Sequence, residues 1–411
     1  MNVKIVPNAL SGEIKAPASK SYAHRLIILS CLSGKSVTVK NVGDSDDVKA
    51  TANCMKSLGA DCNISDGDFI VRSFTPKKSA RIDCGESGST LRFLLPVCSA
   101  LGIKTKVTGS KKLLSRPSEA LINSLNERGA GIENFTVNGK ISAGKFVIDG
   151  SVSSQYISGL LMSLSVLNGE SEVVVKGERV STNYIDITLE VMKDFGVSVI
   201  KTEDGYKVRG GLNAKAIYYN EGDYSGAAFM LSAGAIFGRV SVSGLKSQTS
   251  QGDAEIIDVL KKFGADVNVE DERITVVKNR LKGIEVDCEN IPDLAQIISV
   301  VAAFSEGKTV LKGISRLKYK ESDRIAAITD MLTASKIKWA CDGEKLEITG
   351  GKPKGGTFYS NNDHRTAMSC AILTAGAIGN SVIVGAESVK KSYPDFFKDY
   401  EKLGGKVDVI I

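Results

Sequence analysis

Apolar residues gather into six long runs along the chain, at intervals of roughly 68 residues. Each run begins with polar or charged residues and ends at a glycine before a β-branched strand. The closing glycines are Gly34, Gly102, Gly169, Gly238, Gly307 and Gly379. Because a fixed period of this length is typical of repeat architectures, the pattern predicts one supersecondary unit copied six times.

A second, amphipathic run follows each apolar run and ends on a related signature. The signature is Leu58-Gly59-Ala60-Asp61, Arg128-Gly129-Ala130, Phe195-Gly196-Val197, Phe263-Gly264-Ala265-Asp266 and Leu403-Gly404-Gly405, and the fifth unit has Ala334-Ser335-Lys336 in its place. In the first unit the pattern predicts a strand at 37–39, a helix from Asp46 to Leu58, and a strand pair at 61–64 and 69–71. This alternation favours an α/β fold with crossover connections.

The polar residues of the six apolar runs are concentrated at their starts. In order, the starts are Ser19-Lys20-Ser21 with Arg25, Ser87-Gly88-Ser89 with Arg92, Ser153-Ser154-Gln155, Asp223-Tyr224-Ser225-Gly226, Ile291-Pro292-Asp293, and Asn362-Asp363-His364-Arg365. The remainder of each run has no polar face, which predicts buried helices. Helix starts attract anions because their first N–H groups lack internal partners and the dipole is positive there. Ser and Asp are also good N-caps, but capping does not explain Lys20, Arg25, Arg92 and Arg365.

The composition is that of a large enzyme. The chain has 411 residues, 42% of them hydrophobic and 24% charged, which is enough for two domains. The net charge of +6 suits acidic substrates, but the positive charges are scattered and only 6% of residues are aromatic, so a nucleic-acid surface is not indicated. Eight cysteines form no C-x-x-C pair and lie mostly in apolar runs, as reduced thiols would in a cytoplasmic protein. With two histidines and no Cys/His cluster we expect no metal, and neither a signal peptide nor a membrane span is indicated.

Six units divide into two groups of three. The turn-rich stretch 219–223 predicts one crossing of the chain between the groups, and stretch 16–19 predicts the other. We therefore expect one domain of residues 1–18 with 222–411, and a second of residues 19–221. A cleft between the halves would let helix starts from both face one ligand, and an anionic ligand would draw the domains closed. We expect a monomer.

Eleven short motifs carry a resemblance over essentially the full length. They are Lys20-Ser21-x-x-x-Arg25, Asp44-Ser45-Asp46-Asp47, Gly85-x-x-Gly88-Ser89-x-x-Arg92, Arg116-Pro117, Ser153-Ser154-Gln155, Ser181-x-x-Tyr184-Ile185-Asp186, Gln251-Gly252-Asp253, Ile291-Pro292-Asp293, Lys320-Glu321-Ser322-Asp323-Arg324, Asn362-Asp363-His364-Arg365 and Lys391-Ser392-Tyr393-Pro394-Asp395. Because these motifs occur in this order and at this spacing, the chain resembles the EPSP synthase (3-phosphoshikimate 1-carboxyvinyltransferase) family of enolpyruvyl transferases. The resemblance implies a two-domain inside-out α/β barrel, with three βαβαββ repeats per domain, buried helices and outer sheets.

The resemblance also implies the reaction: transfer of the enolpyruvyl group of phosphoenolpyruvate to the 5-hydroxyl of shikimate 3-phosphate, with release of phosphate. This is a step of the shikimate pathway to chorismate and the aromatic amino acids, and it needs no cofactor. By similarity, phosphoenolpyruvate would be bound by Lys20, Gly88, Arg116, Gln155, Arg324, Arg365 and Lys391. Shikimate 3-phosphate would be bound by Lys20, Ser21, Arg25, Ser153, Ser154, Gln155, Ser181, Asp293 and Lys320. Arginine can hold carboxylate and phosphate through paired hydrogen bonds, and lysine adds compact charge.

Two carboxylates and a lysine are the candidate catalytic groups. Glu321 would exchange a proton with the methylene carbon of phosphoenolpyruvate, Asp293 would take the hydroxyl proton, and Lys20 would share in proton transfer. The positions of Glu321 and Asp293 each also have a plainer, structural interpretation. The run 318–324 could be a solvated charge cluster capping the next helix, and Asp293 could be an ordinary N-cap.

Two other functions fit parts of the pattern. UDP-N-acetylglucosamine enolpyruvyl transferases share the repeat and the chemistry, but they have Lys-Asn where this chain has Lys20-Ser21. They also commonly carry a reactive cysteine in the loop that corresponds to 110–115, which here has none. A six-repeat scaffold that binds nucleic acid or protein would need a basic lining without Glu321 and Asp293 among the helix starts.

Overall fold

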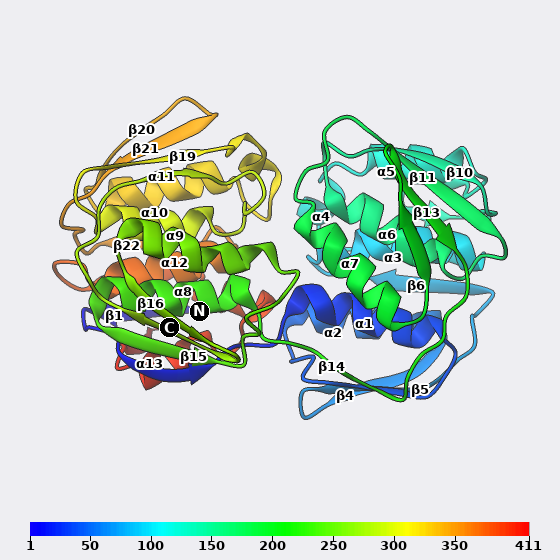
Figure 1. The fold of residues 1–411 in the computed structure, drawn as a ribbon, viewed down its shortest axis with the longest axis horizontal. Helices are drawn as coiled ribbons and strands as arrows, with labels where there is room; N and C mark the ends of the chain where they lie inside the picture. The colour runs from blue at the N-terminus through cyan, green and yellow to red at the C-terminus, as the bar shows by residue number, and fades with distance from the viewer. Residues whose placement is uncertain (411) are drawn as a thin grey trace. The chain divides into compact units, whose positions relative to one another are not determined.

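The computed structural model describes residues 1–410, and their contacts divide the chain into two compact units. Unit 1 combines Met1–Pro17 with the chain from Glu221 onwards, and unit 2 is Ala18–Asn220. The two crossings of the chain are therefore each one residue away from the positions expected from the sequence. Figure 1 shows the elements of each unit.

Residues 1–410 form six four-stranded sheets, three in each unit. The strands of unit 2, in sheet order, are β14 (Ile217–Tyr219), β3 (Val37–Lys40), β5 (Asp68–Phe74) and β4 (Ala60–Ser65); β6 (Ser79–Asp83), β7 (Lys104–Thr108), β9 (Thr136–Val137) and β8 (Ile132–Glu133); and β10 (Lys145–Asp149), β11 (Glu170–Lys176), β13 (Gly205–Arg209) and β12 (Ser198–Lys201). The strands of unit 1 are β2 (Gly12–Lys15), β15 (Arg239–Ser243), β17 (Arg273–Val277) and β16 (Asp266–Glu270); β18 (Glu285–Asp287), β19 (Lys308–Lys312), β21 (Lys345–Thr349) and β20 (Lys338–Cys341); and β22 (Thr357–Tyr359), β23 (Ser381–Val384), β1 (Asn2–Val6) and β24 (Lys406–Ile410). Each sheet starts with a parallel pair and continues with two antiparallel pairings, as β10, β11, β13 and β12 illustrate. One strand order thus recurs in all the sheets of both units.

Two strands lie at the crossings of the chain, and each pairs within its own unit rather than with the segment that follows it. Strand β2 precedes the first buried helix of unit 2, yet it pairs in parallel with β15 of unit 1. Strand β14 precedes the first buried helix of unit 1, yet it pairs in parallel with β3 of unit 2. Strand β2 therefore completes a sheet of unit 1, and strand β14 completes a sheet of unit 2.

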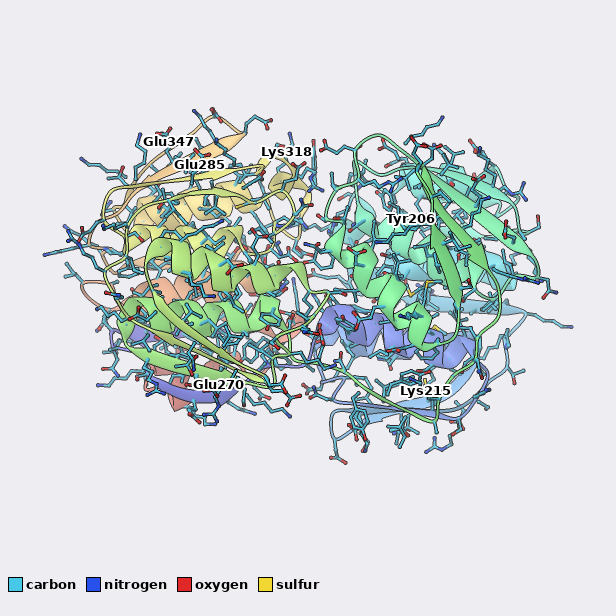
Figure 2. The ribbon with its side chains drawn as sticks, in the orientation of Figure 1. Tyr206, Lys215, Glu270, Glu285, Lys318 and Glu347 are labelled. Atoms are coloured by element: carbon cyan, nitrogen blue, oxygen red, sulfur yellow. The ribbon has the colours of Figure 1, made fainter. Side chains whose placement is uncertain are left out.

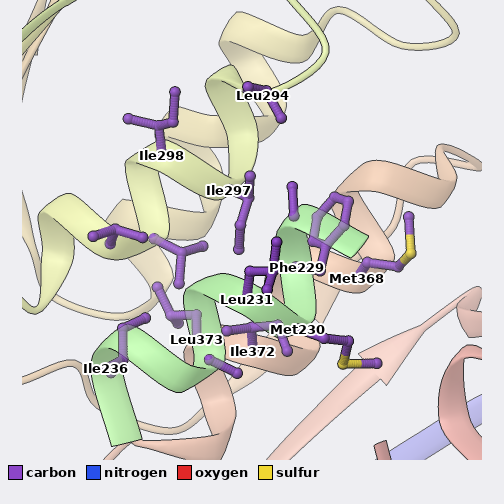
Figure 3. Packing of buried hydrophobic residues seen from close by; sticks show 14 of the residues in the cluster. Phe229, Met230, Leu231, Ile236, Leu294, Ile297, Ile298, Met368, Ile372 and Leu373 are labelled. Atoms are coloured by element: carbon purple, nitrogen blue, oxygen red, sulfur yellow. The ribbon is translucent and has the colours of Figure 1, made fainter. Parts of the chain in front are cut away.

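The six apolar runs form the buried helices that the sequence predicts. These helices are α1 (Lys20–Leu32), α3 (Gly88–Leu101) and α6 (Ser154–Leu164) in unit 2, and α8 (Tyr224–Phe237), α10 (Ala295–Ala303) and α12 (His364–Ala375) in unit 1. In unit 1, Phe229 and Leu231 of α8 pack with Ile297 of α10 and Ile372 of α12 (Figure 3). Such a core explains the missing polar face, because nearly every side of these helices is covered.

The amphipathic runs form the second helix of each of the six sequence repeats. They are α2 (Asp46–Leu58), α5 (Glu119–Asn126), α7 (Asn183–Asp194), α9 (Ile256–Phe263), α11 (Arg324–Ala334) and α13 (Phe396–Lys402); shorter helices are α4 (Lys111–Leu114), η1 (Gly252–Glu255), η2 (Ser315–Tyr319) and η3 (Ala386–Lys391). None of the helices in residues 1–410 is long and apolar enough to cross a membrane.

Three helix ends differ from the prediction that the apolar runs continue to their glycines. Helices α6, α10 and α12 end at Leu164, Ala303 and Ala375, several residues before Gly169, Gly307 and Gly379. After α6, the amides of residues 165–167 bond to carbonyls three residues back, which ends the helix in tighter turns. Gly169 has φ +104° and turns the chain into β11. The glycines thus mark the start of the strand rather than the end of the helix.

The sheets cover the helices and carry charge on their outer faces. Their strands alternate between buried and exposed side chains, so one face of each sheet is apolar. Glu285 of β18 and Glu347 of β21 lie in one sheet of unit 1 (Figure 2) and pair across it with Lys312 at 2.5 Å and Lys308 at 2.7 Å. The helices-inside, sheets-outside arrangement expected from the sequence is therefore confirmed within each unit.

The eight cysteines are free thiols. Seven of them are buried, and Cys341 is partly exposed. The expectation that most cysteines lie in the core is therefore confirmed.

Candidate active site

Arg25 is buried in the middle of unit 2. Its guanidinium group donates to Thr188 Oγ1 at 2.7 Å, the Ser21 carbonyl at 2.6 Å and the Tyr184 carbonyl at 2.8 Å. It also lies over the Phe93 ring, 5.0 Å from the centroid. Burial lowers the pKa of Arg25 to about 10, which still leaves the side chain charged at neutral pH. A positive charge is thus fixed rigidly beside Ser21, as binding of a phosphate would require.

Lys20 is the first residue of α1 and lies against the start of α2. Its Nζ is 2.8 Å from Oδ2 of Asp47, and both side chains are mostly buried. Asp47 belongs to a motif recognised in the sequence, but it was not assigned to the site. It holds Lys20 in place at the helix start.

The start of α3 brings Gly88 and Arg116 together. A Cβ added at Gly88 would lie 2.8 Å from Nη1 of Arg116, so the guanidinium group rests directly against the glycine Cα. Ser87 caps the helix by accepting a bond from the Thr90 amide at 3.3 Å. Only a residue without a side chain leaves Arg116 in this position.

The start of α6 carries the three polar residues predicted there. Ser153 is the N-cap and accepts from the Gln155 amide at 3.3 Å, and Ser154 is buried. The Gln155 side chain accepts from Arg92 at 2.7 Å and donates to Ser89 at 2.9 Å. The sequence drew attention to Arg92 at a helix start but gave it no role. In the structure it orients the amide of Gln155.

Ser181 lies in the turn before α7. It is buried and has φ +52°, a conformation that non-glycine residues adopt rarely and that often accompanies functional sites. Helix α7 also supplies Thr188 to Arg25. Apart from Arg25, which lies in the second turn of α1, the residues predicted in unit 2 are at helix starts or in the turns beside helices.

In unit 1, Arg324 binds three carboxylates with one guanidinium group. Nε donates to Asp363 at 2.9 Å, Nη1 to Asp293 at 2.6 Å and Nη2 to Glu321 at 2.7 Å. The side chain of Arg324 is 1% exposed. Burial alone would lower its pKa, but the three carboxylates raise the pKa of Arg324 well above its ordinary value. We call Asp293, Glu321, Arg324, Asp363 and Arg365 the Arg324 cluster.

Asp293 is the centre of the Arg324 cluster. Its second carboxylate oxygen accepts from Nη2 of Arg365 at 3.0 Å, and Nζ of Lys320 lies 3.6 Å from the first. Asp293 is not the N-cap of α10, because that position is occupied by Leu294 and the helix begins at Ala295. The plainer interpretation of Asp293 is therefore wrong.

Asp363 connects the Arg324 cluster to the start of α12. Its side chain caps α12 by accepting from the Arg365 amide at 2.9 Å, and it also accepts from Ser322 at 3.0 Å. Burial opposes the charge of Asp363, but Arg324 and His364 outweigh it and keep its pKa below the ordinary value. The sequence placed Asp363 at a helix start without assigning it a role, and its contact with a residue 39 positions away had no local signal.

The charged run before α11 is only partly solvated. Asp323 caps the helix by accepting from the Ala326 amide at 3.1 Å, as the plainer interpretation expected. Arg324, the next residue, is fully buried in the cluster. The capping interpretation is therefore confirmed for Asp323, whereas Arg324 is not part of a solvated charge cluster.

Lys391 lies at the end of η3, close to the start of α12. Its Nζ donates to the carbonyl of Asn362 at 2.5 Å. It thus approaches the same helix start that provides Asp363 and Arg365.

Within residues 1–410, no three His, Cys, Asp or Glu side chains are grouped as ligands for a metal ion.

Asp253 is a buried carboxyl group near Asp293. Burial and the negative charge of Asp293 raise the pKa of Asp253 to about 7, against the effect of Arg365. Its Oδ2 accepts a bond from Ser225, and no hydrogen bond to its buried Oδ1 is found. The sequence included Asp253 in a motif, but burial and a raised pKa become visible only in the fold.

The fold is that of the enolpyruvyl transferases. It superimposes on the enolpyruvyl transferase NikO from Streptomyces tendae with a TM-score of 0.78 at 16% identity, covering 99% of this chain and 98% of that one. It also superimposes on the structure of EPSP synthase from Acinetobacter baumannii with a TM-score of 0.84 at 25% identity, covering 99% and 100%.

Sequence comparison defines the family within this fold. The profile of EPSP synthase (3-phosphoshikimate 1-carboxyvinyltransferase) matches residues 5–400. Proteins named 3-phosphoshikimate 1-carboxyvinyltransferase from Clostridium novyi and Pyrococcus abyssi are 38% and 39% identical to this chain. The first match covers 99% of this chain and 98% of the relative, and the second covers 95% of each. The chain belongs to the EPSP synthase family.

Proposed function

We propose that this chain transfers the enolpyruvyl group of phosphoenolpyruvate to the 5-hydroxyl of shikimate 3-phosphate and releases phosphate. The observation that carries the proposal is the family match, which spans residues 5–400 and therefore both units. The relatives named above have this activity in their names. The proposal places the chain in the shikimate pathway.

The positive groups of unit 2 are suited to shikimate 3-phosphate. Arg25 is charged, buried and held by three strong hydrogen bonds, so little side-chain entropy remains to be lost when it binds a phosphate. Ser153 and Ser154 stand at the start of α6, where backbone N–H groups and the helix dipole favour negative charge. Ser21 and Ser181 supply further hydroxyls.

Phosphoenolpyruvate is an anion with both a carboxylate and a phosphate. We assign its binding to Lys20, Gly88, Arg116 and Gln155 in unit 2 and to Arg324, Arg365 and Lys391 in unit 1. In the structure Arg324 and Arg365 both bind Asp293, so two of the positive charges assigned to phosphoenolpyruvate lie beside the candidate base.

The reaction proceeds by addition and elimination. The 5-hydroxyl oxygen attacks C2 of phosphoenolpyruvate while C3 gains a proton. Loss of a proton from C3 then restores the double bond and expels phosphate from C2. Asp293, which is held by Arg324, Arg365 and Lys320, accepts the hydroxyl proton. Glu321 exchanges the proton with C3, and Lys20 assists proton transfer. No covalent bond to the enzyme is needed.

A phosphate-release assay with the purified chain tests this function. We expect phosphate only when shikimate 3-phosphate and phosphoenolpyruvate are both present, because neither substrate alone completes the addition. A parallel assay replaces shikimate 3-phosphate with UDP-N-acetylglucosamine. Phosphate release with the nucleotide sugar but not with shikimate 3-phosphate would overturn the assignment.

A further inference from the structure

Four buried polar side chains of unit 2 form a chain of hydrogen bonds that the reaction does not use directly. His24 Nδ1 lies 2.7 Å from Thr51 Oγ1, which lies 2.7 Å from Thr90 Oγ1, which donates to Ser87 Oγ at 2.7 Å. All four residues are at most 1% exposed. They come from α1, α2 and α3 and the cap of α3, so the chain of bonds links the second turns of α1 and α2 with the start of α3. We call these four residues the threonine relay.

The threonine relay has a single direction. Ser87 Oγ accepts from the Thr90 hydroxyl, which has only one proton, so Thr90 must accept from Thr51. The proton of Thr51 is then also used, and Thr51 accepts from the Nδ1–H group of His24. The alternative acceptor for both threonines is the Asp47 carbonyl at 3.5 Å, which is too far to compete with partners at 2.7 Å.

His24 is neutral in this arrangement. Burial lowers the pKa of His24 well below its ordinary value, and the charges of Lys20 and Arg25 lower it further. A neutral imidazole with its proton on Nδ1 is the form that the relay requires. A neutral imidazole carries its proton on either nitrogen, and the direction deduced from the hydroxyl groups places it on Nδ1.

The relay ends at the turn that carries Gly88. Ser87 both caps α3 and receives the last bond of the relay, and Gly88 follows it directly. The Arg116 guanidinium group rests on the Gly88 Cα, so movement of this turn would displace Arg116. At its other end the relay begins one turn beyond Lys20. It thus connects two segments that we assign to phosphoenolpyruvate.

We infer that His24, Thr51 and Thr90 are positioning residues for phosphoenolpyruvate. They do not touch the substrate, but fix the Ser87–Gly88 turn and, through it, the guanidinium group of Arg116. This inference rests on the proposed function. The shikimate 3-phosphate residues Arg25 and Ser153 are held by separate hydrogen bonds, so the relay should act on one substrate and not on the other.

Thr51→Val tests the inference because valine keeps the shape of threonine and removes the hydroxyl group. We expect the KM for phosphoenolpyruvate to rise roughly three- to tenfold, the effect of losing a buried hydrogen bond. The KM for shikimate 3-phosphate and kcat should change by less than about twofold. Thr51→Ser restores the hydroxyl and should return the KM for phosphoenolpyruvate to the wild-type value.

Thr374→Val is the matched control. Thr374 is buried in α12, and its hydroxyl bonds only within its own helix, to the carbonyls of Cys370 and Ala371. It should leave both KM values unchanged. If Thr51→Val does not fold, Thr90→Val breaks the relay next to Ser87 and carries the same expectation.

The results separate the relay from the function itself. An active wild-type enzyme in which Thr51→Val raises both KM values equally, or lowers only the unfolding temperature, overturns the inference and leaves the proposed function intact. A rise in the phosphoenolpyruvate KM that Thr51→Ser fails to reverse also overturns it. Wild-type protein without enolpyruvyl transfer would instead remove the proposed function.

Discussion

At the scale of single residues, Arg324 explains how several carboxylates can occupy one buried site. Removing a charge from water is costly, and it is tolerated only where partners compensate for it. Asp293 and Asp363 each accept a bond from the same guanidinium group, and Glu321 accepts a third. Loss of Arg324 would leave three negative charges close together. The two candidate catalytic carboxylates, Asp293 and Glu321, therefore depend on a residue that we also assign to phosphoenolpyruvate.

Glu321→Gln should lower kcat by about 10²–10⁴, the usual contribution of a positioned acid or base. Glutamine keeps the size of the side chain and an oxygen acceptor for Arg324, so the KM for phosphoenolpyruvate should change little. Steady-state phosphate release measures both. Glu306→Gln is the control, since Glu306 forms an exposed ion pair with Arg280 and should leave kcat unchanged. An undiminished kcat in Glu321→Gln would assign the carbon chemistry to another group.

Asp253 should make folding stability depend on pH. Its pKa is raised from 3.8 to about 7, so the folded state holds a proton that the unfolded state has lost between these values. Stability therefore falls as the pH rises through this window, by at most about 4 kcal/mol. Asp253→Asn has no carboxyl group to titrate and lacks this loss. The free energy of unfolding of the variant, minus that of the wild type, should therefore increase from pH 5 to pH 8.

Urea unfolding at the two pH values measures this difference. Asp258→Asn, on the exposed surface of neighbouring α9, serves as the control and should follow the wild type. Parallel pH dependence in Asp253→Asn and the wild type would show that Asp253 is ionised throughout.

At the scale of elements, the helix starts are where sequence and structure agree best. Ser87, Ser153 and Asp363 cap their helices as local patterns predict, because a cap bonds to an amide only two or three residues away. Asp293 has the same kind of local context, yet Leu294 occupies the N-cap position of α10, and the distant Arg324 and Arg365 bind Asp293. Helix ends were less predictable: the turns after α6, α10 and α12 depend on where the next strand joins its sheet.

Gly88→Ala should weaken phosphoenolpyruvate binding through the start of α3. The new Cβ would lie 2.8 Å from Nη1 of Arg116, closer than such atoms approach, so the arginine side chain must shift. We expect a higher KM for phosphoenolpyruvate and an unchanged KM for shikimate 3-phosphate. The unfolding temperature should not fall, because alanine is favourable in a helix. An unchanged phosphoenolpyruvate KM would show that the position of Arg116 does not matter for binding.

At the scale of the whole molecule, the period of the apolar runs predicted both the α/β class and the division into two groups of three. Each unit has its own core, and the crossings lie within one residue of the expected positions. The expected bounds place β2 and β14 in the correct units but in no particular sheet, because a strand's pattern shows which face is buried and not which neighbour it joins. Closure of the two halves on a ligand stays a prediction.

The pairing of β1 has a consequence for synthesis on the ribosome. Strand β1 lies between β23 and β24, and β2 pairs with β15, so both wait for partners that are translated after unit 2. Unit 2 is continuous in sequence and can fold while these strands are still unpaired. Unpaired strand edges promote aggregation. Strands β1 and β2 are therefore synthesised before unit 2 but pair only after it, and during this interval their edges are open to aggregation.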